Sequence, residues 1–302
     1  MAGQTYAQSA SSVDKPQNQY KLKLPVDEEV LTFHAVDEHG LPVHNLKADE
    51  IRIFDNGSSP RRKMAFDSTL NRPLRTAILL DTSESMEQDV SVGKHIAQQF
   101  AEHIFRQESD QAIVIDFAYE SDPSGRWTGN ASYLSHNIQN VRVGARNPIH
   151  GTAIFNAIFR TCAYDFKDAD PAVTGNFILL ISDGEDDAGK TSMEEALRAC
   201  QGSNTVIYAF RIPSKDAYNS SGPKTLADLA TNTGGRVFPA NGAPDQILDD
   251  LNTIESEMRN QYRLVYTPES LKHDGKFHSI ELQMPDRVKQ VEVRSGYFAA
   301  RQ

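Results

Sequence analysis

The pattern of hydrophobic positions changes twice along the chain. Its central part alternates between short apolar runs, typical of buried strands, and the apolar spacing of helices. Short apolar runs such as Thr76–Leu80 and Phe177–Ile181 are separated by stretches with apolar residues at helical spacing, such as Val92–Phe105. Regular alternation of strands and helices predicts a mostly parallel sheet with right-handed crossovers. The fold class expected for residues 73–260 is therefore a doubly wound α/β domain.

Both ends of the chain have the alternating pattern of β-strands. The predicted strands are Val30–Val36, Glu50–Phe54, Arg62–Phe66, Tyr262–Tyr266, Lys276–Leu282 and Val288–Arg294. An isolated hairpin is marginal in water, and three uncovered strands are weak. We therefore expect residues 20–72 and 261–302 to pack together as one β-sandwich, with the α/β domain inserted between them.

Two local signals refine this picture of the amino-terminal part. Asp55-Asn56-Gly57 is a strong hairpin turn signal, and Arg62–Phe66 is the candidate for the returning strand. Residues 1–19 are rich in Gln, Ser and Ala and contain no apolar segment, so they are expected to form a disordered leader and not a signal peptide.

Charge and hydropathy exclude several classes of partner. The 302 residues carry a formal net charge of -10, which argues against binding to nucleic acid or to an anionic membrane surface. No apolar run approaches the ~20 residues of a membrane helix. We therefore expect no nucleic-acid partner and no transmembrane segment.

The chain has only two cysteines, Cys162 and Cys200, and they lack the C-x-x-C spacing of zinc and redox sites. Two interpretations remain open. The first is a pair of small buried hydrophobes. The second is a disulfide between two neighbouring helices, which an exported protein would favour.

Three short segments far apart in the chain carry the oxygen-bearing side chains of a cation site. They are Asp81-Thr82-Ser83-Glu84-Ser85, Gly151-Thr152 and Ser182-Asp183-Gly184, and the first and third each follow an apolar run. The carboxyl ends of parallel strands form the usual ligand crevice of open α/β sheets. Hydroxyl and carboxylate oxygens there suit hard cations such as Mg²⁺, Mn²⁺ or Ca²⁺.

The order and spacing of these segments resemble the von Willebrand factor A (VWA) domain, over roughly residues 74–260. That family has a Rossmann-like α/β fold and a metal-ion-dependent adhesion site (MIDAS). The flanking segments resemble the VWA-related proteins common in acidobacteria. The matching segments are Val36–Val43, Phe54–Gly57, Tyr262–Pro268, Asp274–His278 and Gly296–Ala299.

The resemblance implies a role for each matching position. Ser83 and Ser85 would give hydroxyl oxygens to the metal directly, and Thr152 directly or through water. Asp81 and Asp183 would reach the metal mainly through water. Mg²⁺ is the favoured ion, with Mn²⁺ and Ca²⁺ as alternatives. The resemblance also implies that a Glu or Asp of a partner protein fills the remaining position, as expected for a cation held by neutral hydroxyls.

One position departs from the family pattern, which has a small residue where this chain has Glu84. Its carboxylate either points into solvent, which we favour, or leans over the metal and competes with an acidic ligand. Glu185, Asp186 and Asp187 follow the third segment. They are expected to form a solvated loop or, as the alternative, a second Ca²⁺ site, and their charge should repel an acidic partner.

The function expected is a non-enzymatic, metal-dependent protein-binding or adhesion module. It would lie outside the cytoplasm, with its signal peptide absent from this sequence; a cytoplasmic location is the alternative. A metal-assisted hydrolase is a second hypothesis, although the chain lacks a Gly-x-Ser-x-Gly elbow, a His-Glu-x-x-His motif and a phosphate loop. A third is an adaptor subunit for an ATPase.

Overall fold

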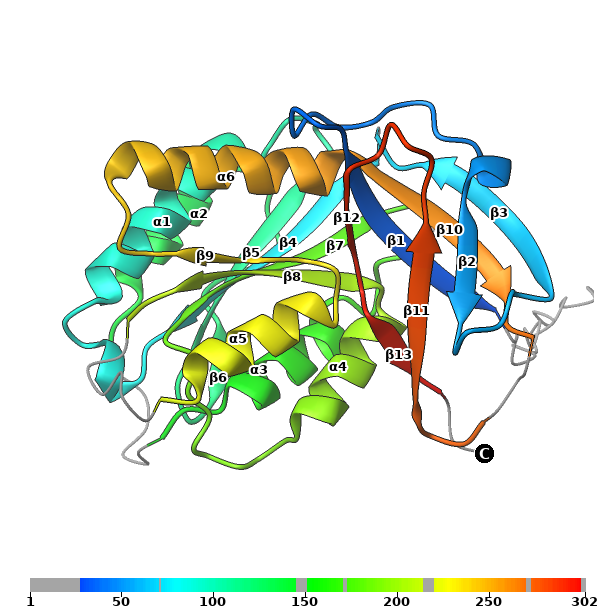
Figure 1. The fold of residues 1–302 in the computed structure, drawn as a ribbon. Coiled ribbons are helices and arrows are strands. Elements are labelled where there is room, and N and C mark those ends of the chain that lie inside the picture. Colours follow the sequence, from blue (N-terminus) through cyan, green and yellow to red (C-terminus); the bar gives the residue numbers. More distant parts are fainter. Residues whose placement is uncertain are drawn as a thin grey trace, which may run out of the picture.

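A six-stranded sheet forms the centre of the larger part of the molecule (Figure 1). The computed structural model describes residues 28–70, 72–144, 151–170, 173–213, 220–269 and 273–299. The leader predicted over residues 1–19 lies outside them. The sheet has the order β6-β5-β4-β7-β8-β9, and only the edge strand β6 is antiparallel to its neighbour. Its strands are β4 (Leu74–Asp81), β5 (Gln111–Phe117), β6 (Ser121–Pro123), β7 (Gly175–Ser182), β8 (Thr205–Arg211) and β9 (Val237–Pro239).

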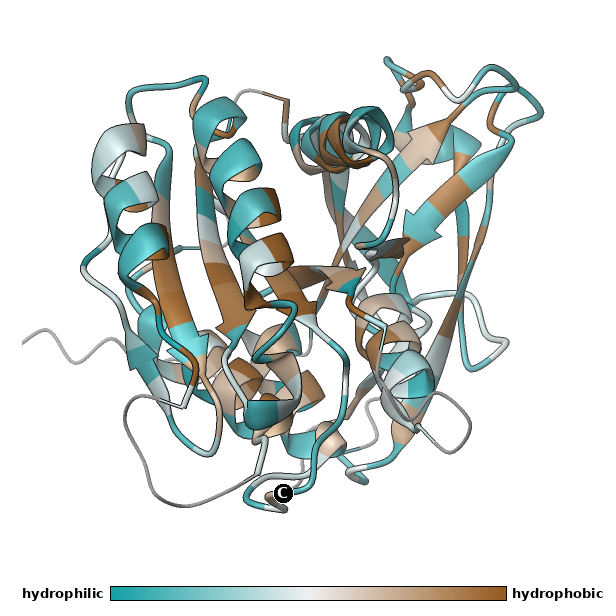
Figure 2. Ribbon diagram, turned by 90° about the vertical axis from the view of Figure 1, so that its left-hand side faces the viewer, coloured by the Kyte–Doolittle hydropathy of each residue, from teal (hydrophilic) through white to brown (hydrophobic). Residues whose placement is uncertain are grey.

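Helices cover both faces of this sheet. One face carries α1 (Val90–His103), α2 (Ala131–Asn140) and α6 (Pro244–Arg259). The other carries α3 (Ile154–Arg160), which continues into a π-helical turn over Thr161–Asp165, together with α4 (Met193–Gly202) and α5 (Gly222–Thr231). Because both faces are buried, the inner strands are continuously apolar (Figure 2).

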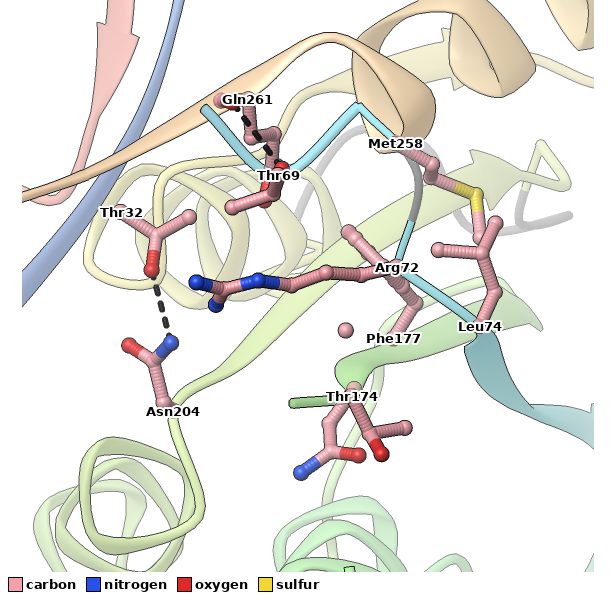
Figure 3. A pocket seen from close by; sticks show the side chains of 11 residues that line it. Thr32, Thr69, Arg72, Leu74, Thr174, Phe177, Asn204, Met258 and Gln261 are labelled. Atoms are coloured by element: carbon pink, nitrogen blue, oxygen red, sulfur yellow. Dashed lines mark hydrogen bonds between the residues drawn. The ribbon is translucent and has the colours of Figure 1, made fainter. Parts of the chain in front are cut away.

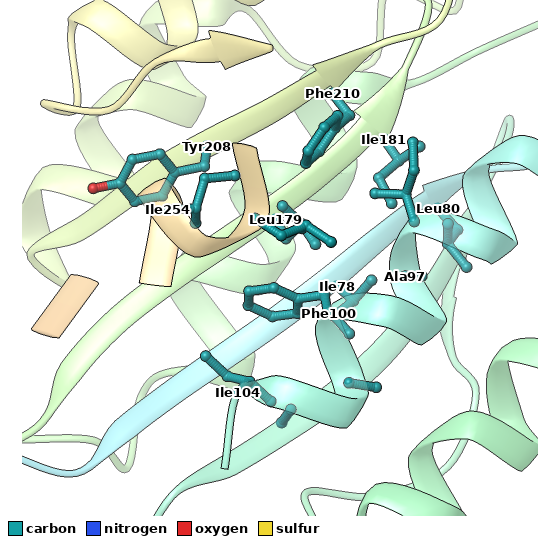
Figure 4. Close-up of a cluster of buried hydrophobic side chains, with 14 of the residues drawn as sticks. Ile78, Leu80, Ala97, Phe100, Ile104, Leu179, Ile181, Tyr208, Phe210 and Ile254 are labelled. Atoms are coloured by element: carbon teal, nitrogen blue, oxygen red, sulfur yellow. The ribbon is translucent and has the colours of Figure 1, made fainter. Parts of the chain in front are cut away.

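The core between the sheet and α1 shows how this burial is achieved. Phe100 of α1 and Ile104, the residue that follows α1, belong to one cluster with Ile78 of β4, Leu179 of β7 and Ile254 of α6 (Figure 4). All five side chains are at most 2% exposed. The predicted doubly wound, mostly parallel α/β fold is confirmed.

The two chain ends form two further, antiparallel sheets. Their orders are β12-β1-β10-β3 and β13-β11-β2. The strands are β1 (Glu29–Val36), β2 (Arg52–Asp55), β3 (Arg62–Ser68), β10 (Gln261–Thr267), β11 (Phe277–Gln283), β12 (Gln290–Val293) and β13 (Gly296–Phe298). Leu31, Phe33, Ile53, Leu264 and Ile280 form a shared core between the two sheets. The sandwich expected from both ends of the chain is confirmed, while the domain boundaries stay a prediction.

The polar interior of the sandwich joins segments from both chain ends. The Asp55 carboxylate is buried and accepts hydrogen bonds from the hydroxyls of Tyr266 and Tyr297, both at 2.9 Å. His278 lies beside them, with its Nδ1 3.3 Å from the Tyr297 hydroxyl. Burial, followed by the nearby Asp55 charge, raises the pKa of both tyrosines, so they remain neutral donors.

The predicted hairpin between Glu50–Phe54 and Arg62–Phe66 is wrong, although its turn forms. Asn56 and Gly57 have positive φ angles of 47° and 78°, and Asp55 and Ser58 exchange backbone hydrogen bonds. The strand that follows, β3, pairs with β10 in the other sheet, and β2 pairs with β11. Local turn chemistry is thus satisfied, but burial of the apolar faces decides the pairing.

The helix α2 and the short strands β6 and β13 were not predicted. α2 buries only Leu134 and Ile138, so its sequence carries a weak apolar stripe. The short segment η1 (Ala48–Glu50) and the turn η2 (Glu84–Met86) are 3₁₀-helical. Within the described residues, no helix is both long and apolar enough to cross a membrane.

The two parts of the molecule meet at the amino-terminal edge of the parallel sheet. A small cavity there is lined by residues of both parts (Figure 3). At its margin, the Asn204 side chain donates to the Thr32 hydroxyl at 2.7 Å. Nearby, Arg198 of α4 donates to the carbonyls of Ala299 and Gly275 at 2.9 and 2.6 Å. Direct side-chain contacts therefore fix the sandwich against the α/β part.

A disulfide joins Cys162, in the π-helical turn after α3, to Cys200 of α4. The two Cα atoms are 5.0 Å apart and 38 residues separate the cysteines in sequence. Of the two interpretations that the sequence left open, the structure therefore has the disulfide.

We predict that replacing both cysteines by alanine lowers the free energy of unfolding by about 4 kcal/mol, because a cross-link over this separation restricts the unfolded chain. Urea unfolding of the double variant and of the oxidised wild type measures the difference. Mass spectrometry of unreduced protein that finds both thiols free would contradict the premise.

Candidate metal centre

The carboxyl ends of two adjacent parallel strands bring the first and third motifs together. β4 ends at Asp81 and β7 ends at Ser182, with Leu80 paired to Ile181 in register. The Asp81 carboxylate is 1% exposed. Its Oδ1 accepts the backbone N–H of Ser83 at 3.0 Å, and its Oδ2 accepts the Ser182 hydroxyl at 2.6 Å. The motif after β4 is thereby folded back over the end of its own strand and tied to β7.

Three side-chain oxygens form a continuous row at this position. Ser83 Oγ lies 3.1 Å from Ser85 Oγ, and Ser85 donates to Asp183 Oδ2 at 2.9 Å. A cation that binds oxygens octahedrally at 2.0–2.1 Å holds neighbouring oxygens about 2.9 Å apart. The observed separations are those of ordinary hydrogen bonds, and they are also compatible with neighbouring ligands of one such ion. Ser85 is exposed, so this row opens to solvent.

Thr152 comes from a third segment, just before α3. It is buried, at 5% exposed, and its backbone is bound by the loop that follows Asp183. Within the described residues, its hydroxyl makes no hydrogen bond with the side chains of Asp81, Ser83, Ser85 or Asp183. The structure thus joins four of the five predicted residues by hydrogen bonds and places the fifth on a neighbouring segment.

Ser182 supports the candidate centre, although no role was predicted for it from the sequence. It is fully buried, donates to Asp81 and accepts the backbone N–H of Gly184 at 2.9 Å. Its position at the last residue of the strand was the available signal. Gly184 itself has a φ of 88°, and a side chain there would meet the Gly222 carbonyl at 2.4 Å. Only glycine fits this turn without displacing α5.

The remaining acidic residues differ in their surroundings. Glu84 is exposed at the rim of the centre, and the direction of its carboxylate stays a prediction. Glu185, Asp186 and Asp187 lie in a loop, as expected, but Glu185 and Asp186 are half-buried and only Asp187 is exposed. Glu185 accepts the Ser221 hydroxyl at 2.8 Å and Asp186 accepts the Phe155 N–H at 3.0 Å. Asp187 accepts the Thr152 N–H.

The side-chain oxygens of the candidate centre indicate which kinds of metal it could hold. Within the described residues, no group of three or more His, Cys, Asp or Glu side chains is arranged to hold a metal. The candidate centre has only two carboxylates, Asp81 and Asp183, and its remaining oxygens are hydroxyls. Such a site suits hard cations and is poorly suited to metals that require thiolate or imidazole.

Burial disfavours the ionised form of Asp81. Burial raises the pKa of Asp81 to about 6, although hydrogen bonds from Ser182 and Ser83 oppose the change, and the neighbouring Asp183 charge raises it further. The folded protein therefore holds the Asp81 proton more tightly than the unfolded chain does. Between pH about 4 and about 6, the contribution of Asp81 to stability falls as pH rises, and it stays low above pH 6.

We predict that Asp81→Asn in EDTA is more stable than the wild type at pH 7.5 and that this advantage disappears by pH 4. Asn keeps an oxygen for the Ser83 N–H and removes the buried charge. Urea unfolding of both proteins across this pH range gives the difference. An advantage that is constant with pH would show that the Asp81 charge is not its source.

Comparisons with known proteins agree with this architecture. The sequence model of the von Willebrand factor type A domain matches residues 77–254. None of the curated proteins matches this chain. A von Willebrand factor type A protein from Catenulispora acidiphila is 11% identical with a TM-score of 0.50, covering 91% of this chain and 74% of that one.

Two further structures are similar to this chain at low identity. Proximal thread matrix protein 1 from the mussel byssus, with a zinc-occupied MIDAS motif, is 14% identical with a TM-score of 0.52, covering 68% of this chain and 50% of that one. An aerotolerance-related membrane protein from Bacteroides fragilis is 18% identical with a TM-score of 0.49, covering 61% of this chain and 98% of that one. At these identities the likeness shows the fold alone. The family match spans more than half of the chain, and the protein therefore belongs to the von Willebrand factor type A domain family.

Proposed function

We propose that this protein is a non-enzymatic, metal-dependent protein-binding module that recognises an acidic residue of its partner. The observation that carries the proposal is the row of oxygens from Ser83, Ser85 and Asp183, spaced at 3.1 and 2.9 Å. The zinc-occupied MIDAS motif named for the mussel protein, which is similar to this chain, supports the proposal of a cation site.

The residues suggest a division of roles around the ion. Ser83 and Ser85 would bind the cation through their hydroxyls, and Thr152 would do so directly or through water. Asp81 and Asp183 would hold the serines and bind through water, in keeping with their hydrogen bonds to Ser83 and Ser85. When bound, the cation would supply a positive charge that neutral hydroxyls leave largely uncompensated.

A carboxylate from a partner is the group that best completes such a site. It would bring a negative charge to an under-neutralised cation and make a charge-assisted contact. Ser85 and Glu84 are both exposed, so this side of the centre is open to a partner. Mg²⁺ is the favoured ion, because the observed oxygen spacing matches its short metal–oxygen distances.

Binding is favoured over hydrolysis by the state of the carboxylates. A hydrolase needs a general base near the metal. The two carboxylates of the centre are already engaged, Asp81 by Ser83 and Ser182, and Asp183 by Ser85 and the Glu185 N–H. We therefore propose that the site holds a ligand and does not turn it over.

An extracytoplasmic location is part of the same proposal. The disulfide between Cys162 and Cys200 supports it, because structural disulfides form and persist mainly in oxidising compartments. An adhesive module of this kind would meet its partners outside the cytoplasm.

Calorimetric titration tests the cation site. We expect one Mg²⁺ or Mn²⁺ to bind per wild-type chain and no binding to Asp81→Ala, which loses the anchor of the Ser83 segment. Glu87→Ala, which removes an exposed carboxylate near the motif, is the matched control and should still bind. Absence of binding to the wild type at millimolar Mg²⁺ and Mn²⁺ would refute the proposal.

Capture from an extracytoplasmic fraction tests the partner class. We expect immobilised protein to retain a partner in Mn²⁺ and to release it in EDTA, and Asp81→Ala to retain none. Replacing acidic residues of the captured partner by their amides should then abolish binding. Metal-dependent turnover in a hydrolase screen, lost in Asp81→Ala, would favour an enzyme instead.

A further inference from the structure

The loop that follows Asp183 reaches across to the segment that carries Thr152. We call residues 185–188 the acidic loop. The Thr152 carbonyl accepts the backbone N–H groups of Asp187 and Ala188 at 3.1 and 3.0 Å. In return, the Thr152 N–H donates to the Asp187 carboxylate. Both polar groups of the Thr152 backbone are therefore bound by this one loop.

The next residue of the acidic loop holds the start of α3. Asp186 Oδ2 accepts the backbone N–H of Phe155 at 3.0 Å. The N-cap residue of α3 is Ala153, which has no side-chain oxygen to offer. A carboxylate from another segment therefore satisfies an N–H that the local sequence leaves without a partner.

The acidic loop lies close to the backbone around Thr152 at one end and continues from Asp183 at the other. A side chain at Gly151, where φ is 116°, would meet Asp187 Oδ1 at 2.9 Å, so the Asp187 carboxylate lies directly against the backbone before Thr152. On its other side the loop is continuous with Asp183, whose Oδ1 accepts the Glu185 N–H at 3.1 Å. The acidic loop thus spans the distance between two of the five predicted site residues.

Thr152 depends on this connection. Within the described residues, its hydroxyl makes no hydrogen bond with the side chains of the other four predicted ligands, whereas its backbone is bound to the loop that continues from Asp183. In the part of the chain that the structure describes, the acidic loop binds both the N–H and the carbonyl of Thr152. The next residue is also held, because the Ala153 N–H donates to the Ala118 carbonyl at 2.9 Å.

We propose that Asp187 and Asp186 are positioning residues that hold the Thr152 segment at the cation site. The proposal rests on the proposed metal-binding function. In this proposal the two carboxylates accept hydrogen bonds from backbone N–H groups. They act neither as metal ligands nor as a second cation site. Loss of a hydrogen-bond partner that orients a metal-binding group typically lowers the affinity for the metal by about 10–100-fold.

Two variants of Asp187 separate positioning from simple charge. Asp187→Ala removes the acceptor of the Thr152 N–H, whereas Asp187→Asn removes the charge and keeps an acceptor oxygen. We expect Asp187→Ala to weaken Mn²⁺ binding by about tenfold or more, and Asp187→Asn to retain most of the affinity. Glu87→Ala removes a nearby exposed charge without touching the loop, and it should behave like the wild type. The same comparison applies to Asp186→Ala and Asp186→Asn.

A second readout does not depend on the metal. In EDTA, Asp187→Ala should accelerate hydrogen exchange at the Thr152 amide, and Asp186→Ala should do so at the Phe155 amide. Thermal unfolding in EDTA shows whether each variant is folded.

The outcomes are distinguishable. Equal losses of affinity in Asp187→Ala, Asp187→Asn and Glu87→Ala would overturn the proposal in favour of long-range charge. Unchanged affinity and exchange in Asp187→Ala would overturn it outright. If the wild type binds no Mn²⁺, the proposed function fails, and the exchange rates still decide whether these carboxylates hold the segment.

Discussion

The parallel pairing of β4 with β7 is the constraint on which the candidate centre depends. It places the ends of two strands, about 100 residues apart in sequence, side by side at the same edge of the sheet. The Asp81 carboxylate then reaches Ser182, and Ser85 reaches Asp183. The apolar runs before each motif stabilise this pairing, because both faces of the strands are buried between helices. The chemistry of the site is therefore positioned by the core beneath it.

Burial that stabilises the sheet also disfavours the ionised form of Asp81. The neighbouring Asp183 charge adds to this effect, whereas hydrogen bonds from Ser182 and Ser83 oppose it. If the proposed cation binds here, the stabilisation that it supplies would depend on its concentration. A second buried carboxylate, Asp55, accepts hydrogen bonds from two hydroxyls, those of Tyr266 and Tyr297.

Much of the fold and of the centre followed from the sequence, for identifiable reasons. Continuous apolar runs predicted the buried strands, and the order of the polar motifs predicted that Asp81, Ser83, Ser85 and Asp183 would meet. The pairing of β3 was not predictable from the Asn56-Gly57 turn, because the turn forms whichever strand follows it. The contacts of Asp186 and Asp187 were also hidden, because their partners are backbone N–H groups, which every residue except proline carries. The disulfide stayed open because its formation depends on how α4 packs against the turn after α3.

The sandwich and the candidate centre lie at opposite ends of the parallel strands. β4 has eight residues, which corresponds to roughly 26 Å of extended chain between them. A partner held at Ser85 and an attachment made through the sandwich would pull along the axis of β4 and β7. Such a load would pass along β4, whose inner residues from Ala77 to Asp81 are at most 1% exposed.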